Sequence, residues 1–302
     1  YMRDRKSLRQ LSNEEKPLVA IAAHDALTAK MITRAGFKSL AIGGSSMLAA
    51  RYGLPDIGLA ALEEMAAGAR DIIAATDLPV IIDGDDGYGD IKNVSHTIHT
   101  YERIGVSGVV LEDQSRDHKQ PGDDKAHGVI TEDYMAAKIK AAVASREDKE
   151  MLIIARTDSY QLEGLTGALK RGEKYLAAGA DGVFIPGVKT VEEIAKIGEA
   201  FMGTYQFIGL FETGKTPWLT PNELGSMGYK QVVFPAAIML RVIKIIDSAL
   251  TDLKNFVENK KPLLPFSEQS EARDIMQDVL CHKNWKKFEE TYNLSLIHIS
   301  EP

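Results

Sequence analysis

The segment Pro79-Val-Ile-Ile-Asp-Gly-Asp-Asp-Gly-Tyr-Gly-Asp90 decides the fold predicted for this chain. Its first residues, Val80, Ile81 and Ile82, form a short β-branched run of the kind that fills a buried parallel strand. Four aspartates and three glycines follow within residues 83–90. Aspartates repel one another and glycines lose backbone entropy on ordering, so this segment needs a compensating interaction.

A divalent cation is the simplest partner for these carboxylates. Asp83 and Asp85 stand two residues apart at the end of the predicted strand, so a turn there can bring both to one ion. Mg²⁺ commonly takes one or two carboxylates together with water and substrate oxygens. The alternative is an ordinary polar turn rich in aspartate and glycine.

Seven further apolar runs alternate with helical patterns along the chain. The predicted strands are 19–23, 39–43, 80–83, 108–112, 151–156, 182–185, 206–209 and 231–234. The predicted helices are 3–15, 25–34, 59–75, 93–104, 131–145, 167–178, 191–201, 221–227 and 236–257. Eight such units predict a (β/α)₈ TIM barrel. A doubly wound open sheet is less favoured, because no glycine fingerprint follows the first strand.

The composition changes after the barrel pattern ends. We expect a catalytic barrel domain over residues 1–259, a C-terminal linker and helices over 260–292, and a non-native or disordered tail over 293–302. The segment from Glu268 to Tyr292 carries one apolar face that includes Trp285 and Phe288. Such a face can be exchanged with a neighbouring subunit, as a helix swap, or can pack on its own barrel.

Charge and cysteine content limit the partners. The net charge of -7 disfavours nucleic acid, which needs a basic face. The single cysteine, Cys281, excludes an internal disulfide and favours the cytoplasm. No apolar run approaches a membrane span, and no signal-peptide pattern opens the sequence, so no membrane partner is expected.

In a barrel, the loops after the strands build the working face. The residues at or just after the ends of the predicted strands include Gly43-Gly-Ser-Ser46, Asp83, Asp85, Glu112, Arg156 and Glu212. The acids can hold Mg²⁺, with Mn²⁺ as a possible substitute, and the ion can stabilise an enolate. Arg156 can clamp a carboxylate or phosphonate, and the backbone amides of residues 44–46 can hold a second carboxylate.

Several motifs together resemble one known family. They are His24-Asp-Ala-Leu-Thr-Ala29, Gly43-Gly-Ser-Ser46, Gly53-Leu-Pro-Asp-Ile-Gly58, Asp83-Gly-Asp-Asp-Gly-Tyr-Gly89, Leu111-Glu-Asp-Gln114, Ala155-Arg-Thr-Asp158 and Glu212-Thr-Gly-Lys-Thr-Pro217. Over residues 18–250 the chain resembles the isocitrate lyase/phosphoenolpyruvate mutase superfamily. The resemblance implies a (β/α)₈ barrel, Mg²⁺, 2-oxo or 2-hydroxy acid substrates and C-terminal helices exchanged between subunits.

The resemblance also assigns site residues. The implied metal acids are Asp56, Asp83, Asp85 and Glu112. The predicted catalytic residues are Arg156, Glu112, Lys119 and Asp123, the last two from a loop in which the chain departs from the family pattern. The implied substrate-binding residues are Gly43, Gly44, Ser45, Tyr88, Arg156 and Glu212.

The chain departs from the family pattern in one loop. The carbon–carbon lyases of the family carry a cysteine acid there, but Lys119-Gln-Pro-Gly-Asp123 has Pro121 at that position and Asp123 in place of a histidine. Asp123, His118, His127 and Tyr88 are the alternatives for the acid. Lys119 could correspond to the loop lysine of the phosphonopyruvate mutases.

Two further positions differ. Gly209 replaces an asparagine that often precedes Glu212 by three residues, and Pro186-Gly187 replaces a Glu or His after the sixth strand.

We therefore predict a Mg²⁺-dependent lyase that cleaves a C–C bond of a small 2-oxo or 2-hydroxy carboxylic acid through a metal-stabilised enolate. The alternatives are a C–P bond enzyme (a phosphonomutase or phosphonopyruvate hydrolase), an oxaloacetate decarboxylase, or a barrel that binds without catalysis. The expected partners are a small carboxylic or phosphonic acid and further copies of the chain, as a dimer or tetramer.

Overall fold

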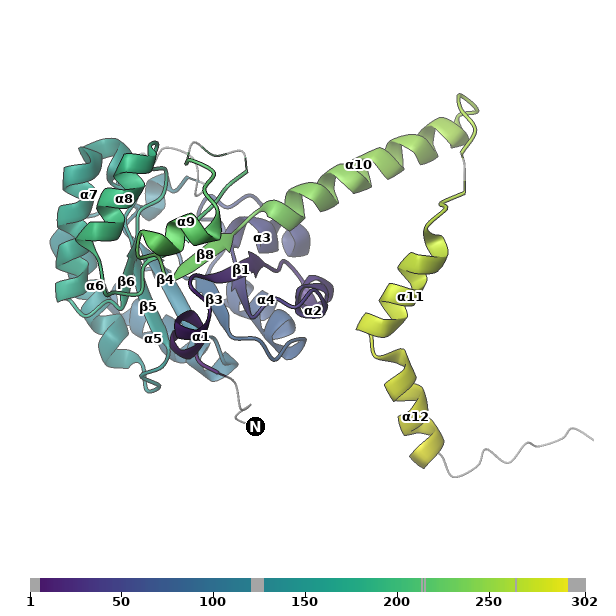
Figure 1. Ribbon diagram of the computed structural model, residues 1–302, viewed down its shortest axis with the longest axis horizontal. Coiled ribbons are helices and arrows are strands. Elements are labelled where there is room, and N and C mark those ends of the chain that lie inside the picture. The colour runs from purple at the N-terminus through teal and green to yellow at the C-terminus, as the bar shows by residue number, and fades with distance from the viewer. Residues whose placement is uncertain (1–5, 121–127, 213, 215, 264, 293–302) are drawn as a thin grey trace, which may run out of the picture. The chain divides into compact units, whose positions relative to one another are not determined.

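The computed structural model describes residues 6–120, 128–212, 214, 216–263 and 265–292. Eight parallel strands form a nearly closed barrel surrounded by helices (Figure 1). The strands are β1 (Leu18–Ala22), β2 (Ser39–Ile42), β3 (Val80–Asp83), β4 (Gly108–Glu112), β5 (Leu152–Arg156), β6 (Gly182–Phe184), β7 (Phe207–Gly209) and β8 (Gln231–Phe234). The predicted TIM barrel is confirmed.

Strand pairing runs in the order β6-β5-β4-β3-β2-β1-β8-β7. The remaining seam, between β6 and β7, is bridged just before both strands, where the amide of Tyr205 donates to the carbonyl of Asp181 at 2.8 Å. The backbone of Tyr205 lies so close to Gly182 that a Cβ at residue 182 would lie 1.8 Å from the carbonyl oxygen of Tyr205. Only glycine permits this approach.

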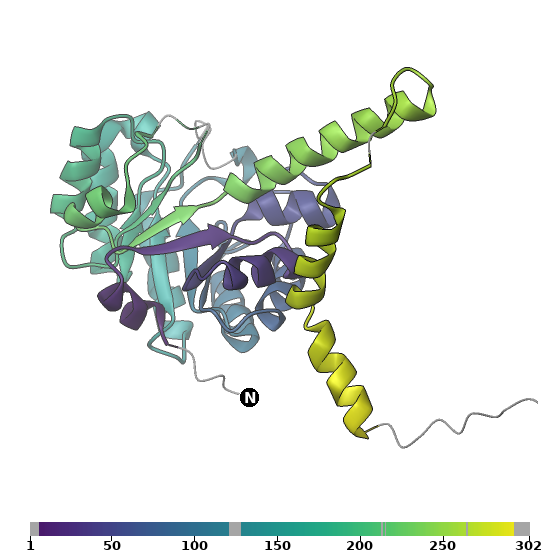
Figure 2. The same ribbon diagram turned by 45° about the vertical axis from the view of Figure 1, so that its right-hand side comes forward.

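The helices between β1 and β8 lie outside the strands (Figure 2). The helices of the described residues are α1 (Leu8–Glu14), α2 (Ala26–Arg34), α3 (Gly44–Tyr52), α4 (Leu62–Ala74), α5 (Ile91–Ile104), η1 (Arg116–His118), α6 (Glu132–Ser145), α7 (Tyr160–Ala177), α8 (Val191–Ala200), α9 (Pro221–Ser226), α10 (Ala237–Val257), α11 (Gln269–Val279) and α12 (His282–Tyr292). Asp25, Asp90, Thr131 and Thr190 cap helix N-termini with side-chain hydrogen bonds, as their residue types favour.

Alternation along each strand divides the core into two layers. On β3, Ile81 belongs to the apolar cluster inside the barrel, whereas Val80 and Ile82 pack in the cluster between strands and helices. On β5, Ile154 faces inward and Ile153 faces the helices in the same way. Both faces of these strands are covered, which explains their continuous apolar sequences.

Two helical features differ from the prediction. Residues 44–52, expected to begin as a loop, form α3, with Gly43 as its N-cap. Helix α7 begins at Tyr160 rather than at residue 167, and its helical geometry is interrupted at Gly164. Both regions contain glycine, which lowers helix propensity, so the sequence pattern does not predict these helices. Tertiary contacts stabilise them.

The chain divides into two compact units, residues 1–243 and 244–302. This division falls inside α10, while the predicted boundary at 259–260 follows the end of that helix. The predicted tail, 293–302, lies outside the described residues. No helix in the described part of the chain is long and apolar enough to cross a membrane.

Candidate active site

A pocket of about 650 Å³, including its open mouth, lies at the carboxyl ends of the strands. Gly43, Asp83 and Arg156 line it from the ends of β2, β3 and β5. Glu112 ends β4 and is the register partner of Arg156 on β5. The barrel therefore brings together side chains that are far apart in the sequence.

The acids predicted to bind metal meet at a buried lysine. The Nζ atom of Lys119 lies 3.1 Å from Asp56 Oδ1 and 3.6 Å from Glu112 Oε1, and it donates a hydrogen bond to Asp85. Lys119 is 5% exposed and Glu112 is 1% exposed. Asp56, Asp85 and Glu112 thus surround one position that holds a positive charge.

The backbone after β3 turns sharply to place Asp85. Asp85 itself adopts a left-handed conformation with φ of 47°, and its amide donates to Asp83 Oδ1 at 3.1 Å. A Cβ at Gly84 would lie 2.6 Å from Val109 Cγ1, so this position requires glycine. The aspartate-glycine pattern is therefore explained by backbone geometry as well as by charge.

Burial governs the protonation of these acids. It raises the pKa of Asp85 to about 6 and that of Glu112 to about 8, although the charge of Lys119 opposes both shifts. Burial alone would lower the pKa of Lys119, but Glu112, Asp85 and their acidic neighbours raise it. Lys119 is therefore held as an ammonium.

The donor set fits a hard cation. Both carboxylate oxygens of Glu112 are buried without a hydrogen-bond partner, and the neighbouring side chains offer further carboxylate oxygens, which Mg²⁺ prefers. Within the described residues, no three acidic, imidazole or thiol side chains are close enough together to hold an ion by themselves. An ion that takes one or two of these carboxylates and completes its coordination with other oxygens would suit this arrangement.

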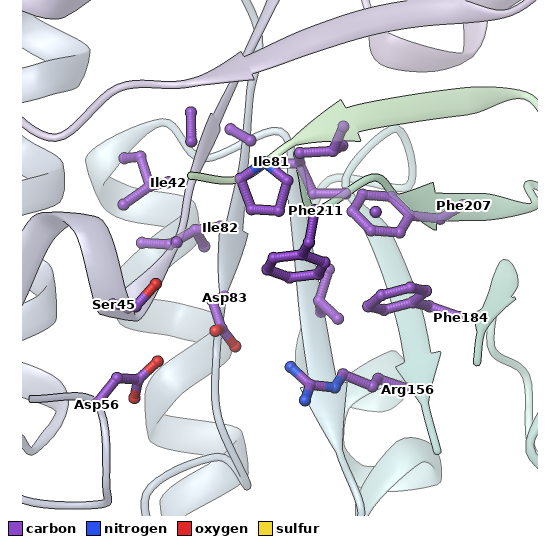
Figure 3. A pocket seen from close by; sticks show the side chains of 18 residues that line it. Ile42, Ser45, Asp56, Ile81, Ile82, Asp83, Arg156, Phe184, Phe207 and Phe211 are labelled. Atoms are coloured by element: carbon purple, nitrogen blue, oxygen red, sulfur yellow. The ribbon is translucent and has the colours of Figure 1, made fainter. Parts of the chain in front are cut away.

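Arg156 joins the acid cluster to the pocket. Its guanidinium donates to Asp158 Oδ1 at 2.7 Å and lies 3.1 Å from Glu112 Oε2. Its Nε is buried without a hydrogen-bond partner, and its guanidinium points toward Asp83 (Figure 3). This orphaned donor at a pocket wall is available to an anionic ligand.

The N-terminus of α3 lies at the same pocket. Gly44 and Ser45 line it, and the first amides of any helix lack intrahelical acceptors. A Cβ at Gly44 would come within 2.8 Å of Asp56 Oδ2, so this glycine allows Asp56 to approach the helix end. Gly43, Gly44 and Ser45 are thus brought beside the predicted metal acids.

The structure does not bring every predicted residue to the pocket. The hydroxyl of Tyr88 hydrogen-bonds the buried Tyr101 hydroxyl at 2.8 Å, and burial followed by Tyr101 raises the pKa of Tyr88. Glu212 forms a two-pronged pair with Arg241, at 2.6 and 2.7 Å. Neither is among the pocket-lining residues. Their side chains have partners elsewhere.

The structure describes some of the residues proposed as the loop acid and not others. His118 lies in η1 and is exposed. Asp123, Pro121 and His127 lie outside the described residues. Lys119, predicted from the same loop, reaches the acid cluster as described above.

Sequence reasoning missed the support behind Arg156. Asp113 accepts hydrogen bonds from Thr157 Oγ1 at 2.7 Å, the Tyr175 hydroxyl at 2.8 Å and the Asp158 amide at 2.9 Å. Arg171 adds an ion pair at 3.2 Å. This network holds the chain that follows β5. The motifs Leu111-Glu-Asp-Gln114 and Ala155-Arg-Thr-Asp158 contain several of its members, but the contacts between them were not visible in sequence.

Sequence reasoning also missed an apolar side of the pocket. Phe184, Phe207, Gly209 and Phe211, from β6, β7 and the residues after β7, line it together, and we call these four the phenylalanine wall. The rings of Phe184 and Phe207 pack edge to face with centroids 4.9 Å apart. Figure 3 shows the three rings grouped away from Ser45 and Asp56.

A parallel barrel with an acid cluster, a buried arginine and a helix N-terminus at one mouth defines a class of barrel enzymes that bind small anions. Within that class, the family model described as phosphoenolpyruvate phosphomutase matches residues 8–254, so the chain belongs to this family. The superfamily resemblance drawn from the motifs is confirmed.

Named relatives include lyases. The chain is 39% identical over 248 residues to 2,3-dimethylmalate lyase of Eubacterium barkeri, covering 82% of this chain and 85% of the relative. It is 35% identical over 227 residues to 2-methylisocitrate lyase of Halalkalibacterium halodurans, covering 75% and 74%. A solved structure of oxaloacetate acetylhydrolase with 3,3-difluorooxalacetate matches with a TM-score of 0.85 at 27% identity, covering 96% and 97% of the two chains.

Proposed function

We propose that this protein is a Mg²⁺-dependent lyase that cleaves a C–C bond of a small 2-hydroxy or 2-oxo carboxylic acid. The observation that carries the proposal is the convergence of Asp56, Asp85 and Glu112 on the Lys119 ammonium beside the pocket that Arg156 lines. The lyase names of the two relatives support it. Asp83, which lines the same pocket, is the fourth proposed acid of the metal site.

For a 2-hydroxy acid the proposed cleavage balances without an added reactant. The hydroxyl loses its proton, the C2–C3 bond breaks, and the electron pair stays on C3 as an enolate. Return of a proton to C3 then yields a 2-oxo acid and a carboxylic acid. Bound Mg²⁺, or Mn²⁺ in its place, would supply positive charge for the oxygens that become more negative in this step.

The roles proposed for the chain's own residues follow from their positions. Arg156, which lines the pocket and has a buried Nε without a hydrogen-bond partner, binds the substrate carboxylate, and the amides of Gly44 and Ser45 hold a second anionic oxygen. Glu112 orients Arg156 from the neighbouring strand. Lys119, a buried ammonium, offsets part of the negative charge of Asp56, Asp85 and Glu112 beside the pocket.

A substrate panel tests this proposal. Purified protein with Mg²⁺ is offered 2,3-dimethylmalate, 2-methylisocitrate, isocitrate and oxaloacetate, and release of 2-oxo acid is measured. We expect turnover of at least one of these acids, its loss in EDTA, and competitive inhibition by oxalate, whose paired oxygens resemble the carboxylate and carbonyl oxygens of the 2-oxo acid product. No turnover of any member in the presence of Mg²⁺ or Mn²⁺ would overturn the lyase proposal.

A C–P bond enzyme is the second candidate. The buried ammonium of Lys119 next to the predicted metal acids favours it, because phosphonate oxygens need positive charge beyond that of one metal ion. The family description, a phosphomutase, points the same way. Phosphorus NMR on phosphonopyruvate and phosphoenolpyruvate decides: a new phosphorus resonance supports this candidate, and unchanged spectra remove it.

We further propose that the chain forms a homo-oligomer in the cytoplasm. Apolar residues of α10 recur at intervals of three and four and are 47–75% exposed: Ile243, Ile246, Leu250, Leu253 and Val257. A sustained apolar stripe of this spacing is typical of a helix that packs against another helix. Trp285, Phe288 and Tyr292 form a second exposed stripe on α12. One free cysteine, Cys281, fits a reducing compartment.

A further inference from the structure

The phenylalanine wall gives the pocket a second chemical character. Phe184 and Phe207 are 6% and 7% exposed, and Val233 and Pro235 of the β8 region continue the apolar lining beyond them. All pocket-lining residues that the structure describes between β6 and β8 are apolar. Arg156 marks the border, because its guanidinium lies 5.7 Å from the Phe184 ring centroid.

The space beside this wall comes from small residues. Barrel interiors are usually filled by bulky branched side chains, but here Ala22 and Ala41 face the pocket from β1 and β2, and Gly209 faces it from β7. A Cβ at Gly209 would meet Phe184 at 3.3 Å and Phe211 at 3.4 Å, so the glycine borders both rings. An apolar pocket with polar groups at one end is the usual form of a small-molecule site.

We propose that the substrate carries an alkyl chain of several carbons that packs on the phenylalanine wall. Its carboxylate and its 2-hydroxy or 2-oxo group lie at the opposite end, among Arg156, Asp83 and the N-terminus of α3. This inference rests on the proposed function and specifies the substrate class of the same site. An alkyl chain gains by burial against these rings, in proportion to its apolar area.

The phenylalanine wall also disfavours a tricarboxylate whose additional carboxylate would take the place of the alkyl chain. A carboxylate directed at Phe184, Phe207 and Phe211 would lose water without meeting a charged or hydrogen-bonding side chain among the described lining residues from β6 to β8. Burial of an unpaired charge is strongly unfavourable. The site therefore selects alkyl-substituted malates over isocitrate-type tricarboxylates.

Binding of 2-oxo acids tests the inference apart from cleavage. Calorimetry with Mg²⁺ present compares pyruvate, 2-oxobutyrate, 2-oxopentanoate and 2-oxohexanoate. We expect Kd to fall about fourfold for each added methylene, the factor that corresponds to its burial. Equal Kd values along the series would overturn this inference alone. No binding by any member, pyruvate included, would overturn the proposed function and this inference with it.

Two variants locate the effect at the wall. Gly209→Val fills the space between Phe184 and Phe211, so the gain per methylene should vanish while pyruvate still binds. Phe211 is only partly buried, so Phe211→Ala should fold. This variant should raise the Kd of 2-oxohexanoate about tenfold and change the Kd of pyruvate little. If Gly209→Val shows no cooperative unfolding transition and so does not fold, Phe211→Ala alone tests whether the alkyl chain packs on the phenylalanine wall. An unchanged series in Phe211→Ala would contradict the proposed location.

A turnover series gives the matching kinetic result. With malates that carry 2-methyl, 2-ethyl, 2-propyl and 2-butyl groups, we expect kcat/KM to rise along the series. Isocitrate and 2-methylisocitrate should be at least about 100-fold poorer substrates. A tricarboxylate that is the best substrate of the panel would overturn the selectivity while leaving the lyase proposal intact.

Discussion

The β2–β5 side and the β6–β8 side of the barrel mouth border one pocket but have opposite chemistry. On the first side, Asp83, Glu112 and Arg156 end their strands and make ion pairs or hydrogen bonds within the cluster. On the second side, Phe184 and Phe207 pack edge to face and carry no charge. Both sides are built by the same inward-facing strand positions, so the fold places the residues and their identity alone determines what each side can bind.

The difference also shows which contacts are sensitive to change. Removing one member of a buried charge cluster leaves the others unpaired, whereas a changed aromatic ring alters shape and area. Substitutions on the charged side should therefore affect activity and metal binding. Substitutions on the apolar side should affect which substrate is preferred.

The largest effect is expected at Arg156, where the two sides meet. Arg156→Met removes the cation that Asp158 and Glu112 share, and it removes the proposed carboxylate clamp. We expect kcat/KM to fall about 10²–10³-fold. The free energy of unfolding should fall by about 3–5 kcal/mol, because two buried carboxylates lose their partner.

Steady-state kinetics and denaturant unfolding measure these two effects. Arg156→Lys is the matched control, because it retains the charge but not the planar fork, so it should preserve stability better than activity. An Arg156→Met variant within tenfold of wild-type activity would show that the charged side does not bind the substrate carboxylate.

A smaller effect is expected at Asp85. Asp85→Asn keeps an oxygen that can accept from Lys119 and suits the left-handed backbone, but it removes one negative charge. We expect Mg²⁺ affinity, measured by calorimetry, to fall about 10–100-fold, with little change in the unfolding temperature of metal-free protein.

Asp85→Ala separates charge from backbone at this position. Alanine must adopt the same positive φ, at a cost of about 1–2 kcal/mol, and it offers no acceptor to Lys119. It should therefore be less stable than Asp85→Asn at equal loss of charge. Unchanged Mg²⁺ binding in both variants would remove Asp85 from the proposed metal site.

Gly44 tests how closely the charged side is packed. In Gly44→Ala the new methyl group would press on Asp56, whose Oδ2 lies 2.8 Å from the ideal Cβ position. We expect Mg²⁺ affinity to weaken by about tenfold, as for loss of a supporting contact. Gly43→Ala is the matched comparison for metal binding, because nothing lies within 4 Å of its Cβ. Equal Mg²⁺ affinities in the two variants would contradict the role proposed for this approach.

The smallest effect on the residues of the barrel mouth is expected from a substitution on α10. Leu250→Asp places a charge in the exposed apolar stripe and should shift the protein to a smaller species in size-exclusion chromatography with light scattering. The free energy of unfolding of the barrel should change by about 0.5 kcal/mol or less, since Leu250 is 61% exposed. Lys244→Asp, off the stripe, is the control. An unchanged mass in Leu250→Asp would contradict the role proposed for the stripe.

Most of the barrel could be predicted because its strands are short branched runs between glycine-rich turns, and every predicted strand agrees with an observed one within one residue at either end. Helix α3 could not be predicted, because Gly43-Gly-Ser-Ser46 lacks both helix propensity and apolar periodicity. Among site residues, Asp56, Asp83 and Arg156 were recognised from motifs and line the pocket. Tyr88 and Glu212 stood in the same motifs, yet their side chains bond to Tyr101 and Arg241.

The order of residues alone determined the eight-fold alternation, the acids at the strand ends and the missing loop cysteine, since each depends on residue type and local spacing. Only the tertiary structure decided that Lys119 lies among Asp56, Asp85 and Glu112, and that three phenylalanines border one pocket. The reason is that an inward-facing phenylalanine has the same local pattern whether it fills the core or lines a cavity. The packing of the neighbouring strands decides between the two, and here Ala22, Ala41 and Gly209 leave the space open.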